Sequence, residues 1–192
     1  MAGLGKQAKI LSETQQRAVV AYLADKRHPE RNIAMFLLSV DAGLRAKELA
    51  ELEWSMLTDS EGNIADAIRL ENRASKGRSG GVVYLSTRLE AALERLRDSQ
   101  RVSGGNVIRS QCRASMSIQG VTNWFLQLYK ELGFEGCSSH SGRRTAITRW
   151  ARNISSVGGS LRDVQSLARH SSISMTQRYI EVSEDACKRV VG

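Results

Sequence analysis

Apolar residues recur every three or four positions over most of this chain, which is the spacing of amphipathic helices. A capping box at Ser12–Gln15 precedes an apolar stripe within Val19–Ala24, and Pro29, suited to a first helical turn, precedes a second stripe within Ile33–Val40. The second of these helices is expected to be buried. The predicted helices begin at Ser12, Pro29, Arg45, Thr87, Ile118, Ser160 and Ser174, with Thr87 as the capping residue of its helix.

The helical spacing is interrupted between Trp54 and Ser86. In this region Ala67–Leu70 and Val82–Leu85 are predicted strands, and Asn72–Gly81 between them predicts a flexible basic hairpin loop. The chain is therefore expected to adopt an α+β fold that is mainly helical and carries one small antiparallel sheet.

The ends of the chain differ from its middle. Residues 1–11 are small, basic and Gly-rich, so a frayed end is expected there, while residues 12–182 are expected to form one folded domain. Residues 183–192 form a short amphipathic tail by sequence. We find no internal repeat and no low-complexity linker.

Charge and cysteine content narrow the classes of function. The net charge of +8 and isoelectric point near 9.8 favour a polyanionic partner, and nucleic acid is the first candidate. A soluble basic domain without such a partner is the alternative that the charge leaves open. The three cysteines follow no disulfide spacing, and no apolar run is long enough for a membrane span. No signal-peptide pattern opens the chain, so a cytoplasmic protein is predicted.

The candidate chemistry is concentrated between His140 and Tyr179. His140 and Arg143 are three residues apart and would share one face of a helix. His170 and Tyr179 would lie on opposite sides of one continuous helix. The residues after His170 interrupt the helix, however, and Ser174–Gln177 is a capping-box pattern, so Tyr179 is predicted in the second turn of a new helix, facing His170.

Several common chemistries lack their residue patterns here. Cys137 and His140 have the spacing of half a zinc site, to which His170 adds one ligand, but no second close pair completes it. The sequence also lacks the carboxylate pattern of two-metal nucleases and the Gly-x-Ser-x-Gly elbow of serine hydrolases. What remains is a set of Arg, Lys and His residues around a phosphate with a hydroxyl nucleophile, for which neither metal nor cofactor is expected.

Three segments and one lysine resemble the catalytic domain of the tyrosine recombinase (phage integrase) family. Asp41–Leu49 resembles its first arginine box, His140–Thr145 its His-x-x-Arg box, and Leu167–Tyr179 its last box, including the step of nine residues to the nucleophile. Lys76 fits the lysine of the family's hairpin. The resemblance covers about residues 12–190.

The resemblance implies that Tyr179 attacks a DNA phosphate to give a 3′-phosphotyrosine and a free 5′-hydroxyl. Arg45 and Arg143 would hold the nonbridging oxygens, and His170 would donate a further hydrogen bond. Lys76 would protonate the leaving oxygen and His140 would assist proton transfer at the tyrosine. Glu48 would orient Arg45, although an ordinary surface ion pair is an equal alternative. The residues expected to contact DNA are Arg73, Lys76, Arg78 and Arg144.

The resemblance also implies double-stranded DNA as partner, a homo-oligomer (a tetramer on paired sites, with a monomer compatible without DNA), accessory DNA-bending proteins, and a bacterial or phage-encoded, nucleoid-associated protein. The tail would dock on a neighbouring copy, or pack or fray on its own. Two alternatives stay open, a regulator that binds DNA without cutting it and a type IB topoisomerase.

The sequence departs from the family pattern in three places. Arg169 stands where relatives have glycine before the last histidine, and Gly142 stands where they have leucine, which predicts changed packing near Arg143. The N-terminal core-binding domain that most relatives carry is expected to be absent, which would lower affinity and site specificity unless a partner supplies them.

Overall fold

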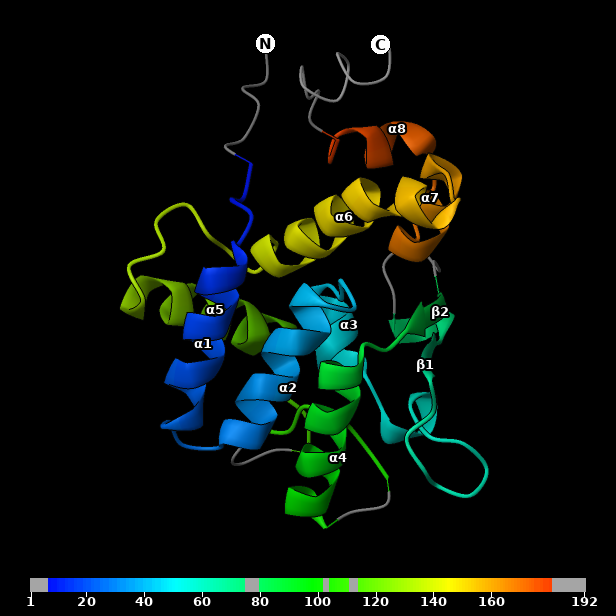
Figure 1. The fold of residues 1–192 in the computed structure, drawn as a ribbon. Coiled ribbons are helices and arrows are strands. Elements are labelled where there is room, and N and C mark those ends of the chain that lie inside the picture. The colour runs from blue at the N-terminus through cyan, green and yellow to red at the C-terminus, as the bar shows by residue number, and fades with distance from the viewer. Residues whose placement is uncertain (1–6, 75–79, 102–103, 111–113, 181–192) are drawn as a thin grey trace, which may run out of the picture. The chain divides into compact units, whose positions relative to one another are not determined.

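The fold was analysed in a computed structural model that describes residues 7–74, 80–101, 104–110 and 114–180. It divides into two compact units, Met1–Ala146 and Ile147–Gly192, which are described one at a time. The elements are coloured along the chain in Figure 1.

Helices dominate the first unit, as the apolar spacing predicts. They are α1 (Glu13–Ala24), α2 (Pro29–Val40), α3 (Ala46–Glu51), α4 (Thr87–Gln100), α5 (Ile118–Glu131) and the first turns of α6 (Ser141–Asn153), with short 3-10 turns at Trp54–Met56 and Asn72–Ala74.

Helix α2 is the centre of this unit, packing against α1 on one side and α4 on the other (Figure 1). Its buried surface is wider than the predicted stripe, because Ala34, Met35, Leu38 and Ser39 are buried as well. A helix covered on several sides needs small or apolar residues around most of its circumference. Helix α2 therefore fixes the direction in which the chain continues, from Val40 towards Arg45.

The two predicted strands pair as an antiparallel hairpin. Strand β1 is Ala67–Leu70 and β2 is Gly81–Tyr84, so the second strand begins one residue earlier than predicted. Side chains of β2 alternate: Val83 is 2% exposed, whereas Tyr84 is 65% exposed. Residues 75–79 of the predicted loop lie outside the described residues.

Two local predictions about the first unit need correction. Helix α4 is capped by Ser86, whose hydroxyl accepts from the backbone of Leu89, while Thr87 is its first helical residue. The segment before α1 is held rather than frayed at its described end. Leu11 is 3% exposed and its N–H donates to Thr145 Oγ1 at 2.8 Å.

The second unit contains the rest of α6, a 3-10 turn at Ile154–Val157, α7 (Leu161–Ala168) and α8 (Ile173–Gln177). Its own small core is formed by Ile147, Val164 and Ala168, with Tyr179 packed against them. Ser160 and Asp163 cap the start of α7 reciprocally. The unit thus holds the last predicted box on a frame of short helices.

Among the described helices, none combines the length and the apolar character that crossing a membrane requires.

Candidate active site

Arg45 lies at the start of α3 and is held by a buried carboxylate. Its backbone N–H donates to Glu48 Oε2 and its guanidinium Nη1 to Glu48 Oε1, both at 2.8 Å. Glu48 is fully buried, while 20% of the Arg45 side chain is exposed. A buried carboxylate requires such partners. The pair is therefore not an ordinary surface ion pair, and it fixes the Arg45 guanidinium in one direction.

Arg143 is anchored to the segment that precedes Arg45. It lies in the first turn of α6, is 4% exposed, and its Nη1 donates to the Gly43 carbonyl at 2.6 Å. Gly43 has φ 64°, a left-handed conformation that glycine adopts without strain. The predicted arginine pair is thus anchored around one turn of backbone, Gly43–Glu48.

The glycine at position 142 has a structural reason. A Cβ added to Gly142 would lie 2.2 Å from Ser39 Oγ and 2.9 Å from Ser39 Cβ. Ser39 lies in α2 and is fully buried. The start of α6 therefore approaches α2 more closely than the leucine of the family pattern would allow. This close approach is the packing change that the sequence predicts beside Arg143.

A second contact, to the buried carboxylate of Asp41, supports the same turn. Arg88 of α4 donates from Nε to Asp41 Oδ2 at 2.6 Å, and Ser86 Oγ donates to the same oxygen at 2.8 Å. The hydrogen bonds that Arg88 donates to the Asp41 carboxylate raise the pKa of Arg88 above its usual value. Asp41 directly follows α2, so these contacts tie the beginning of the first arginine box to α4.

His140 precedes α6 and is exposed. Its backbone N–H donates to Ser138 Oγ at 3.3 Å, and its carbonyl accepts from Arg144 N at 2.9 Å, the bond of a first helical turn. The imidazole therefore lies at the entrance of the helix that carries Arg143.

His170 and Tyr179 come together in the second unit. Their rings stack with centroids 5.4 Å apart and planes inclined by 26°. His170 Nδ1 lies 2.9 Å from Thr176 Oγ1, and both residues are buried. The predicted approach of Tyr179 to His170 is therefore confirmed.

The route by which Tyr179 reaches His170 differs from the prediction. Helix α8 begins at Ile173 and ends at Gln177, so Tyr179 lies beyond it, in a turn closed by its N–H donating to the Thr176 carbonyl at 3.0 Å. Ser172, rather than Ser174, is the residue before the helix. Because α8 begins earlier than predicted and ends at Gln177, Tyr179 lies in the turn that follows the helix and not within it.

Arg169 ends α7 in the conformation that relatives' glycine would take. Its φ and ψ are 53° and 45°, and the N–H groups of Arg169 and His170 donate to the carbonyls of Ser166 and Gln165 at 2.9 and 3.1 Å. These are the bonds of a left-handed helix end. The turn before His170 is thus a left-handed helix end, and it carries an arginine side chain at a position where glycine is favoured.

We expect Arg169→Gly to be more stable than Arg169→Ala by about 1 kcal/mol, because only alanine retains a Cβ in the left-handed region. Both variants lose the rest of the arginine side chain, so their difference isolates the backbone strain. Urea unfolding followed by circular dichroism measures it. An alanine variant as stable as the glycine variant would contradict the left-handed turn.

Two of the four residues predicted to contact DNA, Arg73 and Arg144, have protein partners in the structure. Arg73 donates to Glu53 Oε1 and Oε2 at 3.0 and 2.9 Å and to Glu71 Oε2 at 2.6 Å, and these carboxylates raise its pKa. Arg144 donates to Gln7. A phosphate would have to compete with these partners. Lys76 and Arg78 lie outside the described residues.

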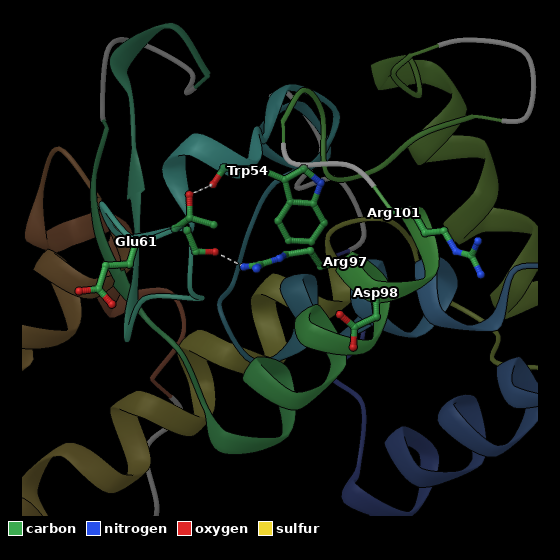
Figure 2. Close-up of a pocket in the computed structure, with 7 residues that line it drawn as sticks. Trp54, Glu61, Arg97, Asp98 and Arg101 are labelled. Carbon is green, nitrogen blue, oxygen red and sulfur yellow. Dashed lines mark hydrogen bonds between the residues drawn. The ribbon is translucent and has the colours of Figure 1, made fainter.

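One hollow in the first unit does not contain the predicted chemistry. It measures about 560 Å³ and is lined by Trp54, Glu61, Arg97, Asp98 and Arg101, among others (Figure 2). Arg97 donates to the Gly62 carbonyl, and Trp54 forms one wall (Figure 2). A shallow hollow of mixed charge fits no single ligand class. Within the described residues no cluster of His, Cys, Asp and Glu suits a metal ion.

Sequence reasoning missed two residues. Thr176 was assigned only to a capping pattern, although a polar residue six positions after His170 was a signal. Ser39 carries no sequence signal at all, because its partner Gly142 is more than a hundred residues away.

The model of the phage integrase family matches residues 9–185. The tyrosine recombinase XerC of Leptospira interrogans is 26% identical over 164 residues, which cover 83% of this chain and 49% of that protein. XerC of Bifidobacterium longum subsp. infantis is 27% identical over 212 residues, which cover 98% of this chain and 56% of that protein. The chain thus spans about half the length of the curated relatives that it matches.

Solved structures show the same fold. The crystal structure of XerA recombinase matches 97% of this chain and 63% of its own, at 21% identity and a TM-score of 0.73. A Tn1549 transposon integrase in complex with a circular intermediate DNA matches all of this chain and 67% of its own, at 16% identity and a TM-score of 0.76. The match of the family model over nearly the whole sequence establishes that the chain belongs to the phage integrase family.

Proposed function

We propose that the chain cuts and rejoins DNA at specific sites through a 3′-phosphotyrosine at Tyr179. The observation that carries this proposal is the stacking of Tyr179 on His170, with ring centroids 5.4 Å apart. It brings together His170 and Tyr179 of the last family box, although no continuous helix connects them. The tyrosine recombinases XerC and XerA are among the relatives, which supports the same reaction.

The proposed first step breaks one bond and forms one. The Tyr179 oxygen attacks the phosphorus, and the bond from phosphorus to the 5′-oxygen breaks. The phosphate stays at the 3′ end of the cleaved strand, as an ester with the tyrosine. The proton of the phenol passes to a base, for which His140 is proposed, and Lys76 protonates the departing 5′-oxygen. Rejoining reverses these steps with a 5′-hydroxyl from the same or another strand, so the reaction needs no external energy source.

The cationic residues have separate proposed roles. Arg45 and Arg143 hold the nonbridging oxygens, where a planar guanidinium fits two oxygens at once. His170 donates one further hydrogen bond. The burial of Glu48 and the bond from Arg143 to Gly43 support these roles, because fixed donors stabilise developing charge without reorganising.

Double-stranded DNA is the proposed partner. The net charge of +8 favours a polyanion, and solved relatives include XerH bound to its difH substrate and a λ integrase dimer bound to a core site. We propose that the chain works as a homo-oligomer on paired sites, and that accessory DNA-bending proteins assist it.

A nicked suicide duplex tests the proposal, because loss of a short 5′ fragment after cleavage prevents rejoining. The duplex should carry candidate sites from the DNA that flanks the gene for this chain. We expect a covalent protein–DNA adduct that survives denaturation, with the nucleotide mapped to Tyr179 by mass spectrometry of proteolytic peptides.

The other outcomes separate the alternatives. Site-specific binding without an adduct would favour a regulator that binds DNA and does not cut it. Relaxation of supercoiled plasmid without recombinant product would favour a topoisomerase. Either result would overturn the assignment as a recombinase.

A further inference from the structure

Thr176 contacts both residues on which the proposed reaction depends in the second unit. Its hydroxyl lies 2.9 Å from His170 Nδ1, and its carbonyl accepts the N–H of Tyr179 at 3.0 Å. Thr176 is fully buried and His170 is 7% exposed. Thr176 thus contacts the histidine through its side chain and the turn that carries the tyrosine through its backbone.

We propose that Thr176 is a positioning residue that keeps the proton of neutral His170 on Nε2, so that this nitrogen can donate to the DNA phosphate. The proposal rests on the proposed function of His170 as a hydrogen-bond donor.

The assignment of the proton follows from what each group can do. A neutral imidazole has one N–H and one acceptor nitrogen, and phosphate oxygens only accept. His170 can donate to phosphate from Nε2 only if Nδ1 is the acceptor or if both nitrogens are protonated. A threonine hydroxyl suits either state, because it donates to a bare Nδ1 and accepts from a protonated one. When the Thr176 hydroxyl donates to Nδ1, the single proton of the neutral ring lies on Nε2, and this is the arrangement that the proposal assigns to His170.

The surroundings hold the ring in one orientation. Gln165 fixes the backbone of His170 from both sides, because its carbonyl accepts from His170 N and its side chain donates to His170 O, each at 3.1 Å. Tyr179 covers the face of the ring. Rotation of the ring by half a turn would remove Nδ1 from the hydroxyl. Thr176 and Tyr179 therefore hold the ring in the orientation in which Nδ1 faces the hydroxyl.

Removal of the hydroxyl should act on His170 while the packing is preserved. Valine has nearly the shape of threonine, so Thr176→Val leaves a buried ring nitrogen without its hydrogen-bond donor. A lost hydrogen bond in a buried site costs about a factor of ten in an equilibrium or rate. We expect Thr176→Val to form the covalent adduct about tenfold more slowly than wild type, with unchanged noncovalent DNA binding.

Two matched variants frame this result. Thr176→Ser retains the hydroxyl and should stay within about threefold of wild type. Thr148→Val makes the same chemical change at another buried threonine of the same unit, one whose hydroxyl lies 3.5 Å from the Tyr179 carbonyl instead of the imidazole. It should also stay within about threefold. A loss as large in Thr176→Ser or Thr148→Val as in Thr176→Val would overturn the role of this hydroxyl.

A double-mutant cycle separates positioning from general stability. In a His170→Ala background the hydroxyl has no imidazole to direct, so Thr176→Val should change the adduct rate by less than about twofold. The same tenfold loss in both backgrounds would show that Thr176 acts on the fold and would overturn the proposal.

The tautomer has its own readout, independent of DNA. In wild type labelled with ¹⁵N-histidine, long-range proton–nitrogen spectra recorded at a pH where the His170 ring is neutral should show its proton on Nε2, and in Thr176→Val a mixture of tautomers. A proton on Nδ1 in wild type would overturn the proposal. If wild type cuts no DNA but shows the Nε2 tautomer, the proposed function is wrong, whereas the proposed effect of Thr176 on the His170 proton is retained.

Discussion

Replacement of Tyr179 by phenylalanine is expected to abolish the covalent adduct on the nicked suicide duplex and to leave noncovalent DNA binding unchanged. Phenylalanine lacks the oxygen that would form the ester. It retains the ring that stacks on His170 and packs against the core of the second unit. The structural cost should therefore be small. The measurements are the adduct band after denaturing electrophoresis and the affinity from a mobility shift.

A matched control is available on strand β2. Tyr84 is 65% exposed and Tyr179 is half-buried, so Tyr84→Phe removes a phenol that is more open to chance reaction with DNA than Tyr179. This variant should form the adduct as wild type does. An adduct in Tyr179→Phe at the wild-type rate would assign the nucleophile to another residue and would end the proposed mechanism.

The sequence predicts the fold where the information is local. The helix starts at Ser12 and Pro29, the two strands, and the burial of α2 all depend on residues within one or two turns of each other. Errors fall at element ends, where neighbouring serines or threonines compete to cap a helix. Ser86 caps α4 in place of Thr87, and Ser172, the residue that precedes α8, lies two positions before the start of the predicted capping pattern at Ser174.

Contacts distant in sequence could not be predicted. The fit of Gly142 against Ser39 and the bond from Arg143 to Gly43 join segments about a hundred residues apart, and no periodicity records them. The left-handed turn at Arg169 shows a different limit. Propensity disfavours arginine there, yet the hydrogen bonds of the helix end impose the conformation. The hydrogen bonds of the helix end override the preference of the single residue at this position.

The two units carry different parts of the proposed chemistry. The first holds Arg45 and Arg143 around the Gly43–Glu48 turn, where buried partners fix them. The second holds His170 and Tyr179 against Thr176. Charge stabilisation and nucleophile are thus built on separate local frameworks, so a substitution in one set can be tested for folding without disturbing the contacts within the other.

Replacement of Arg143 by alanine is expected to lower the rate of adduct formation about a hundredfold or more, because a fixed guanidinium on the phosphate stabilises the charge that develops there. Arg143→Lys keeps the charge but loses the planar fork, so an intermediate rate is expected. Single-turnover cleavage of the suicide duplex measures both. DNA affinity should fall far less than the rate.

The folding cost of this change must be separated from the catalytic one. Arg143 is 4% exposed and donates to the Gly43 carbonyl, so alanine also removes a buried contact beside Arg45. Urea unfolding of Arg143→Ala reports that cost, and cleavage is compared under conditions where both proteins are folded. Arg152→Ala, an exposed arginine in the last turn of the same helix, should cleave at the wild-type rate. Near-normal cleavage by folded Arg143→Ala would exclude this arginine from the phosphate site. A donor that contacts the phosphate cannot be removed without slowing the reaction, because the charge that develops there would lose its hydrogen bond.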